Sequence, residues 1–178
     1  MRRIALYGGQ GGGKSTIGLI ATNLFGDAVA LVHSAAPLYH LQSLVYEYAG
    51  KEIGNGMQDN ELLPMLAGQI RRLNPDGLAE LVIAAADAAE RSARPPRLLL
   101  CDDSVVSDRL ALLRGQFEFV FVDTADDIRA ARRAARGDLN QSGVRPAPDR
   151  QADDPVIPND GALADLEARV EAFLAGVL

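Results

Sequence analysis

The chain has 178 residues, of which 48% are hydrophobic, and its formal net charge is −6. This length suits a single domain spanning residues 1–178, and no apolar run approaches the ~20 residues that cross a bilayer, which excludes a membrane-spanning segment. An acidic chain also lacks the extended basic surface that binds a nucleic-acid polymer.

The N-terminal residues indicate where the protein works. Met1-Arg2-Arg3 precedes only the short apolar run from Ile4 to Tyr7 before the glycines begin, and this run is too short for a secretory signal. We therefore expect a cytoplasmic protein. The single cysteine, Cys101, has no partner for a disulfide or a cysteine-based metal site. The sequence leaves a monomer and a homodimer equally open.

Five apolar segments predict the strands of a parallel sheet. Most of them are continuous rather than alternating, as in strands that are buried on both faces. The segments span residues 4–7, 28–32, 98–101 and 117–122, with a weaker one at 156–157.

The segments between these strands show helical spacing of apolar residues, so that each helix turns one apolar stripe toward a sheet. These segments cover residues 17–24, 38–48, 62–73 and 78–89, and a final helix follows Asn159-Asp160-Gly161. Alternating strands and helices predict an α/β fold, a three-layer sandwich in which helices flank a five-stranded parallel sheet.

The strongest indication of function follows the first predicted strand. Gly8 to Ser15 reads Gly, four residues, Gly-Lys-Ser, and it stands between a strand and a helix, where a P-loop is found. Glycines let backbone N–H groups curl around an anion, and the positive end of the next helix adds its dipole. The pattern predicts a cradle for the phosphates of ATP.

Each residue of this loop has an expected role. Lys14 is expected to bridge the terminal phosphates as a catalytic residue, Ser15 to bind Mg²⁺, and Thr16 to lie near the α-phosphate. The backbone groups that should hold the phosphates belong to Gly9, Gly11, Gly12 and Gly13.

A pair of carboxylates follows the third predicted strand. Bound magnesium usually has a second protein ligand at such a position, and we assign Asp102 first and Asp103 second. A carboxylate here could instead accept a hydrogen bond or a proton from the acceptor group, which makes Asp103 a candidate substrate contact and Asp102 a candidate catalytic residue. Alternatively, Asp103 only caps a helix that starts near Ser104.

The segment from about 137 to 155 is rich in proline, glycine and charge, and too poor in apolar residues to pack a core. It is expected at the surface. Either it is a connector without a function, or it is a short lid over the nucleotide. The second interpretation is favoured by Arg145, Arg150 and the arginine-rich helix just before them.

With these motifs the chain resembles the P-loop nucleoside monophosphate kinases, and among them the phage-type deoxynucleoside monophosphate kinases. The resemblance spans most of the chain. It implies an enzyme that uses ATP and Mg²⁺ to transfer the γ-phosphoryl group to a small-molecule acceptor, a (deoxy)nucleoside monophosphate.

Three further segments carry this resemblance. Ser34 to Tyr39 looks like the family's acceptor-lining stretch, which implies acceptor contacts from Ala35, Ala36, Pro37 and Tyr39. The segment from Leu62 to Pro75 is similar to the helix that carries a substrate-facing arginine, here Arg72 or Arg71, and the acceptor-binding region is expected at about 34–94. The segment 153–161 resembles the loop near adenine, which implies that Pro158 and Asn159 bind ATP.

Four arginines, at positions 129, 132, 133 and 136, recur at helical spacing before the predicted lid, as the arginines that flank the lid do in these kinases. Arginine suits this position because its fork binds phosphate oxygens in pairs and stays charged in the transition state. We expect Arg132 and Arg136 to be functional before Arg129 and Arg133, and Arg132 also to contact ATP. The alternative is a solvated basic face paired with Asp126 and Asp127.

The chain departs from the family pattern at two positions. Ser104 stands where the family places an arginine that holds the acceptor, and Ala36 stands where an aspartate is common. The acceptor's base and sugar therefore stay open, and a specialised or modified monophosphate is among the expected acceptors.

Two other functions compete with this interpretation. A kinase of another small metabolite, such as dephospho-coenzyme A, would share the loop and the last helix. A nucleotide-switched regulatory NTPase would need a switch motif and a base-reading motif, and neither Asp-x-x-Gly after the third strand nor Asn-Lys-x-Asp is present.

Overall fold

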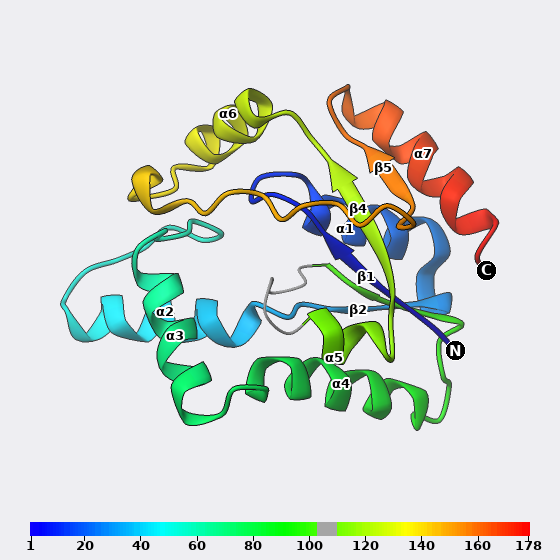
Figure 1. Ribbon diagram of the computed structural model, residues 1–178, viewed down its shortest axis with the longest axis horizontal. Helices are drawn as coiled ribbons and strands as arrows, with labels where there is room; N and C mark the ends of the chain where they lie inside the picture. The colour runs from blue at the N-terminus through cyan, green and yellow to red at the C-terminus, as the bar shows by residue number, and fades with distance from the viewer. Residues whose placement is uncertain (103–109) are drawn as a thin grey trace.

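Five parallel strands form one sheet at the centre of the molecule (Figure 1). The computed structural model describes residues 1–102 and 110–178. The strands are β1 (Arg2–Tyr7), β2 (Val29–Val32), β3 (Leu98–Cys101), β4 (Glu118–Asp123) and β5 (Val156–Pro158). Their order is β2-β3-β1-β4-β5, and every neighbouring pair is parallel. The predicted α/β class and the five-stranded parallel sheet are confirmed.

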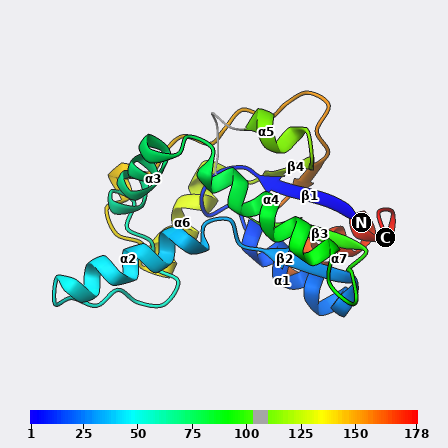
Figure 2. The ribbon, with the colours of Figure 1, turned by 90° about the horizontal axis from the view of Figure 1, so that it is seen from below.

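Helices cover both faces of this sheet. The helices of the described chain are α1 (Lys14–Phe25), α2 (Ala36–Tyr48), α3 (Leu62–Leu73), α4 (Gly77–Glu90), α5 (Leu110–Arg114), α6 (Asp126–Arg136) and α7 (Leu163–Ala175). Figures 1 and 2 show α1 and α7 on one face of the sheet and α4 and α5 on the other. Among the described residues, no helix has the length and apolar character needed to span a membrane.

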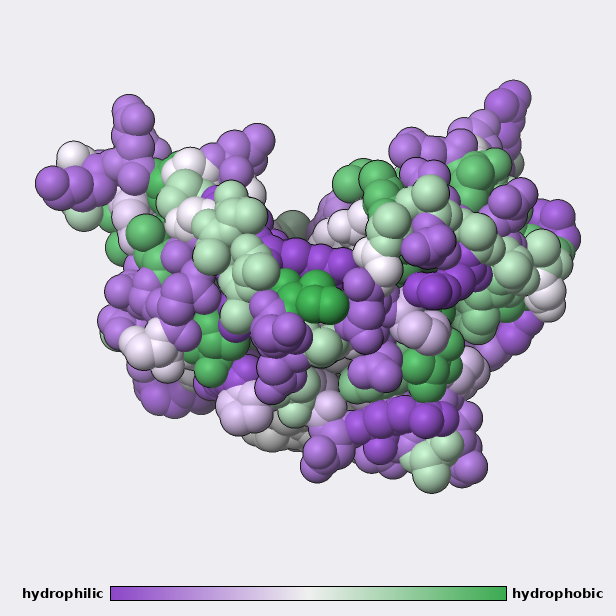
Figure 3. Space-filling view, turned by 90° about the horizontal axis from the view of Figure 1, so that it is seen from above, coloured by the Kyte–Doolittle hydropathy of each residue, from purple (hydrophilic) through white to green (hydrophobic). Residues whose placement is uncertain are grey.

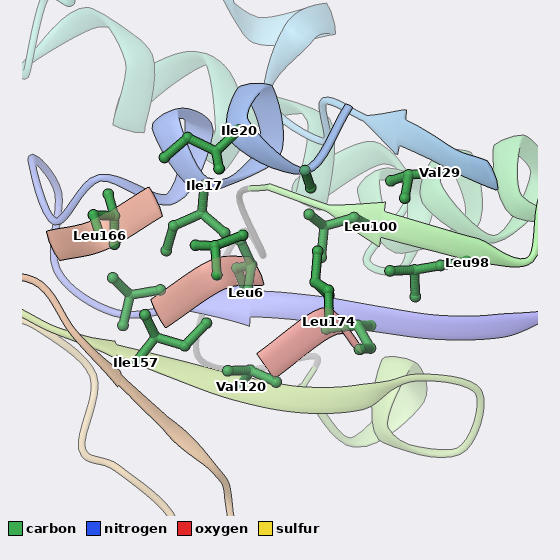
Figure 4. Packing of buried hydrophobic residues seen from close by; sticks show 14 residues of the cluster. Leu6, Ile17, Ile20, Val29, Leu98, Leu100, Val120, Ile157, Leu166 and Leu174 are labelled. Atoms are coloured by element: carbon green, nitrogen blue, oxygen red, sulfur yellow. The ribbon is translucent and has the colours of Figure 1, made fainter. Parts of the chain in front are cut away.

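The strand sequences explain this three-layer arrangement. Side chains alternate between the two faces of a strand, so that Ile4 and Leu6 of β1 pack toward α1 and α7, while Ala5 and Tyr7 pack toward α4. Figure 4 shows the first of these cores, in which Leu6 lies among side chains from neighbouring strands and from both covering helices. Because both faces are covered, the strands are apolar throughout, as the continuous runs predicted.

A separate small core joins α2 and α3 to the start of α4. Its buried residues are Leu38, Ala67 and Leu78. Figure 1 shows α2 and α3 to one side of the sheet, so that the first part of the predicted acceptor-binding region projects beyond the strands, while α4 packs on the sheet. In parallel sheets, ligands bind at the carboxyl ends of the strands, and this region stands next to that edge.

Candidate active site

The phosphate loop runs from Gly8 to Gly13, between the end of β1 and the start of α1. Its two ends require glycine. Gly8 has φ +143°, and a β-carbon there would lie 2.5 Å from the carbonyl oxygen of Val122 in β4. Gly13 has φ +92°, and a β-carbon there would collide with the side-chain amide of Asn159. The loop is thus seated against the ends of β4 and β5, which is possible only without side chains.

Hydrogen bonds from two neighbouring segments hold the loop in shape. The Gly12 carbonyl accepts a hydrogen bond from Thr124 Oγ1 at 3.0 Å and another from Asn159 Nδ2 at 2.8 Å. Inside the loop, Lys14 Nζ donates to the carbonyl oxygens of Gly8 and Gly9, each at 3.1 Å. Lys14 is buried, so its charge is held within the loop, where an anionic phosphate would be bound.

A cavity of about 560 Å³ opens beside this loop. Helices α2, α3 and α6, the segment 143–148 and the start of α7 complete its walls. Figure 3 shows a hollow between two raised sides that carry both hydrophilic and hydrophobic residues, with a hydrophobic group in the hollow. The cavity therefore has room beside the phosphates for a second molecule.

Most of the predicted site residues line this cavity. They are Gly9, Gly11, Gly12, Gly13, Lys14, Ser15, Thr16, Ala35, Tyr39, Arg71, Arg132, Arg136 and Asn159. The lining does not include Ala36, Pro37, Asp102, Pro158 or Arg72. Arg72 is exposed and donates to Gln69 at 3.0 Å, so the structure brings Arg71, not Arg72, to the cavity. Asp103 and Ser104 lie outside the described residues.

The arginines of α6 divide into two pairs. Arg132 and Arg136 line the cavity. Arg132 Nη2 donates to the Asn159 carbonyl at 3.0 Å, while its Nη1 is buried without a hydrogen-bond partner in the described part of the chain. Arg136 is bound to Asp138 through Nε and Nη2, at 2.7 and 2.6 Å. A buried guanidinium nitrogen without a partner marks a place where an anionic ligand would be stabilised.

Arg129 and Arg133 instead hold the phosphate loop from outside. Arg133 Nη1 donates to the Gln10 carbonyl at 2.9 Å. Arg129 is buried and ion-paired with Asp126, and its guanidinium occupies the space that a β-carbon at Gly9 would need. Burial lowers the pKa of Arg133, and the nearby Arg129 charge adds to this. Helical spacing placed these arginines on one helix, but it could not say which ones would touch the loop.

Ser15 and Asp102 are oxygen donors of the kind that Mg²⁺ binds, and of the two only Ser15 lines the cavity. In the described residues there is no cluster of three or more His, Cys, Asp or Glu side chains that could hold a metal. Magnesium needs no such cluster, since it commonly uses one or two protein oxygens together with phosphate oxygens and water. Ser15 lies on the first turn of α1, one turn before Gly18, and a β-carbon at Gly18 would lie 3.4 Å from Asp102 Cβ. Asp102 is buried and its Oδ2 lies 2.7 Å from His33 Nδ1.

Several residues that line the cavity were not predicted from the sequence. Three are amides, Gln10 in the phosphate loop and Gln58 and Asn60 before α3, and a fourth is Arg145 in the segment 143–148. Arg145 was noted only as part of a possible lid. Gln10 occupies a variable position of the phosphate-loop motif, and Gln58 and Asn60 belong to no motif. Because 50 residues of sequence separate Gln10 from Asn60, only the folded chain shows their proximity.

The segment before α3 is attached to the base of the predicted lid. Asp59 is buried at this junction, and its carboxylate accepts hydrogen bonds from Tyr46 Oη at 2.7 Å and Asn140 Nδ2 at 2.8 Å. It also accepts from the backbone N–H groups of Glu61 and Leu62, both at 3.0 Å. Burial alone would raise the pKa of Asp59, but the N–H of Leu62 and the other three donors lower it to about 2.

This lowered pKa predicts how stability depends on pH. A carboxyl whose folded pKa lies below its unfolded value stabilises the protein above the unfolded value and loses this effect as pH falls. A shift from 3.8 to about 2 corresponds to ~2 kcal/mol at neutral pH. We expect Asp59→Asn to lower the free energy of unfolding by that amount at pH 7 and by about half as much at pH 3. Urea unfolding at both pH values measures this, with the exposed Glu61→Gln as the control. Equal losses at the two pH values would contradict the assignment.

Comparison with known proteins shows which fold the chain has. No family model matches it, and no curated protein matches it. A solved sugar kinase from a Janibacter species is 19% identical, with 98% of this chain and 95% of that chain covered and a TM-score of 0.56. A gluconokinase from Sinorhizobium meliloti is 18% identical, with 99% and 93% covered and a TM-score of 0.50. The chain has the fold of these kinases.

A third solved structure agrees with the other two. Shikimate kinase from Acinetobacter baumannii, in complex with shikimate, is 16% identical, with 100% of this chain and 96% of that chain covered and a TM-score of 0.56. The structural neighbours are thus kinases of the P-loop type, and the predicted fold is confirmed at this level.

Proposed function

We propose that the protein is an ATP-dependent kinase of a small molecule, and that its acceptor is a (deoxy)nucleoside monophosphate. The observation that carries the proposal is the shape and lining of the cavity. One end is the phosphate loop with Lys14 and Ser15, and the other end is an acceptor-sized space between α2, α3 and the segment 143–148. A regulatory NTPase needs only the first end.

The charges at the second end support an anionic acceptor. Arg71 is half-buried in α3, lines the cavity, and has no hydrogen-bond or ion-pair partner within the described residues. Arg145 also lines the cavity and likewise lacks such a partner among the described residues. Two guanidinium groups at one cavity, neither with a hydrogen-bond or ion-pair partner in the described part of the chain, are suited to bind the phosphate of a monophosphate. The same charges suit a carboxylate, which is the specific reason to keep an acidic metabolite as the second candidate.

In this proposal each group positions or stabilises, because phosphoryl transfer requires little covalent chemistry from the protein. The loop N–H groups and Lys14 hold the phosphates of ATP, and Arg132, with its unpartnered Nη1, stabilises the charge on the transferred group. Ser15 and Asp102 would hold Mg²⁺, which would supply positive charge beside the phosphates. We also propose that the segment 137–155 acts as the lid, since four of its residues, Gly143, Arg145, Pro146 and Pro148, line the cavity.

A panel of acceptors tests the proposed function. The purified protein is incubated with ATP, Mg²⁺ and one acceptor at a time, chosen from the common ribo- and deoxyribonucleoside monophosphates, dephospho-coenzyme A, D-gluconate and shikimate. We expect ADP release that depends on a monophosphate. Release only with one of the other acceptors would replace the nucleotide by an acidic metabolite. No acceptor-dependent release at all would contradict a small-molecule kinase.

A further inference from the structure

A cluster of side-chain amides connects the phosphate loop to the acceptor wall. Gln10 Nε2 donates to Gln58 Oε1 and to Asn60 Oδ1, both at 2.5 Å. Gln58 Nε2 in turn donates to Tyr39 Oη at 2.8 Å, and Asn60 Nδ2 donates to the Leu139 carbonyl at 2.7 Å. Gln10, Gln58, Asn60 and Tyr39 all line the cavity. These hydrogen bonds link the phosphate loop to the wall formed by α2 and the segment before α3.

The base of the lid fixes which way each amide points. The Leu139 carbonyl can only accept a hydrogen bond, so the Asn60 amide must turn its Nδ2 toward Leu139 and its Oδ1 toward Gln10. Gln10 must then present its Nε2 to Asn60, which it does. The Leu139 carbonyl thus determines, through the Asn60 amide, which end of the Gln10 amide is Nε2 and which is Oε1.

The consequence is a hydrogen-bond acceptor offered to the cavity. With both Nε2 hydrogens used, the remaining polar atom of the side chain is Gln10 Oε1, which has no donor among the described residues. Gln10 Oε1 is not one of the fully buried polar atoms without a partner, so part of its surface is exposed, and Gln10 lines the cavity. Gln10 is only half-buried and stands in the phosphate loop itself.

We propose that Gln10 is a specificity-determining residue, whose Oε1 accepts a hydrogen bond from a hydroxyl or amino group of the acceptor molecule. The inference rests on the proposed kinase function and deepens it by adding a chemical feature to the acceptor. The acceptor carries an acidic group, for Arg71 and Arg145, and also a hydrogen-bond donor, for Gln10. Asn60 acts through Gln10 and is a positioning residue.

Substitution of the amides tests this proposal with the panel acceptor on which the wild-type protein has the highest kcat/KM. Gln10→Leu removes Oε1, and we expect about a tenfold lower kcat/KM for that acceptor, mainly through a higher KM, because a donor of the bound acceptor is left without a partner. Asn60→Leu leaves Gln10 in place but free to turn, and we expect about a threefold loss. Because Asn60 acts through Gln10, the double variant should lose no more than Gln10→Leu alone.

The control is Gln69→Leu, the same change in α3 at an exposed position outside the cavity. Thermal unfolding shows whether each variant is folded. If Gln10→Leu does not fold, Gln10→Met, which keeps the length of the side chain, replaces it. The KM for ATP should change less than the KM for the acceptor.

Each outcome decides between the two proposals. If Gln10→Leu and Gln69→Leu give the same kinetics, or if the losses from Gln10 and Asn60 multiply, or if only the KM for ATP rises, this inference is wrong while the kinase function stands. If the wild-type protein shows no acceptor-dependent ADP release with any panel compound, the proposed function is wrong, and this inference, which rests on it, is wrong with it.

Discussion

Replacing Lys14 by alanine is expected to lower acceptor-dependent turnover at least a hundredfold and to leave the fold intact. Lys14 is the buried cation of the loop and sits 3.1 Å from the Gly8 and Gly9 carbonyls. Removing one group that stabilises transition-state charge in a site of this kind costs on the order of 10²–10³ in kcat, or about 2.7–4 kcal/mol. The hydrophobic cores of the sheet do not involve this side chain.

The chain provides a matched control for this change. Its other lysine, Lys51, is exposed after α2, and Lys51→Ala should keep wild-type turnover. Steady-state kinetics with the best panel acceptor, together with thermal unfolding of both variants, completes the comparison. If the Lys14 variant keeps more than about a tenth of wild-type turnover, Lys14 does not have the assigned role.

The second large effect is expected on stability, from Asp154→Ala. Asp154 is buried, and its carboxylate receives two hydrogen bonds from Arg114, at 2.9 and 2.6 Å, and one from Tyr7 Oη at 2.6 Å. The Arg114 hydrogen bonds lower the pKa of Asp154, while burial raises the pKa of Tyr7. The cluster ties the end of the 137–155 segment to the end of β1, directly before the phosphate loop.

Loss of the carboxylate leaves Arg114 and the Tyr7 hydroxyl without their shared partner. Arg114 is about one-third exposed, with a side-chain exposure of 30%, so water compensates in part. We expect the free energy of unfolding to fall by about 3 kcal/mol, at the lower end of the range for breaking a buried ion pair. Urea unfolding measures this, and the exposed neighbour Asp153→Ala is the control. Equal stability of the two variants would show that the cluster is not stabilising.

The sheet and the phosphate loop could be predicted from the sequence for a physical reason. Strands covered on both faces by helices must be apolar throughout, so that runs such as Leu98 to Cys101 stand out without any alignment. The loop could also be predicted, because Gly8 and Gly13 have backbone conformations and close neighbours that exclude a side chain. In both cases the constraint acts on consecutive residues.

The contacts between distant segments could not be predicted in the same way. Arg71 and Arg72 differ by one position, which on a helix is enough to send one to the cavity and the other to solvent. The ranking of Arg132 and Arg136 ahead of Arg129 and Arg133 stays a prediction. Helical spacing could not show that Arg133 donates to the Gln10 carbonyl or that Arg129 lies against Gly9. The amides of Gln10 and Asn60 meet only in the folded chain, where the segment before α3 packs against Leu139, and no local sequence pattern predicts that contact.

Direct transfer of phosphate is the measurement that tests the account most closely. The protein is incubated with Mg²⁺, the best panel acceptor and ATP labelled at the γ-phosphate, and the products are separated, with the Lys14→Ala variant as the blank. The account predicts that the label moves from ATP to the acceptor and that the blank transfers at most about a hundredth as much. Label that appears only as free inorganic phosphate, or that never leaves ATP, would contradict a small-molecule kinase.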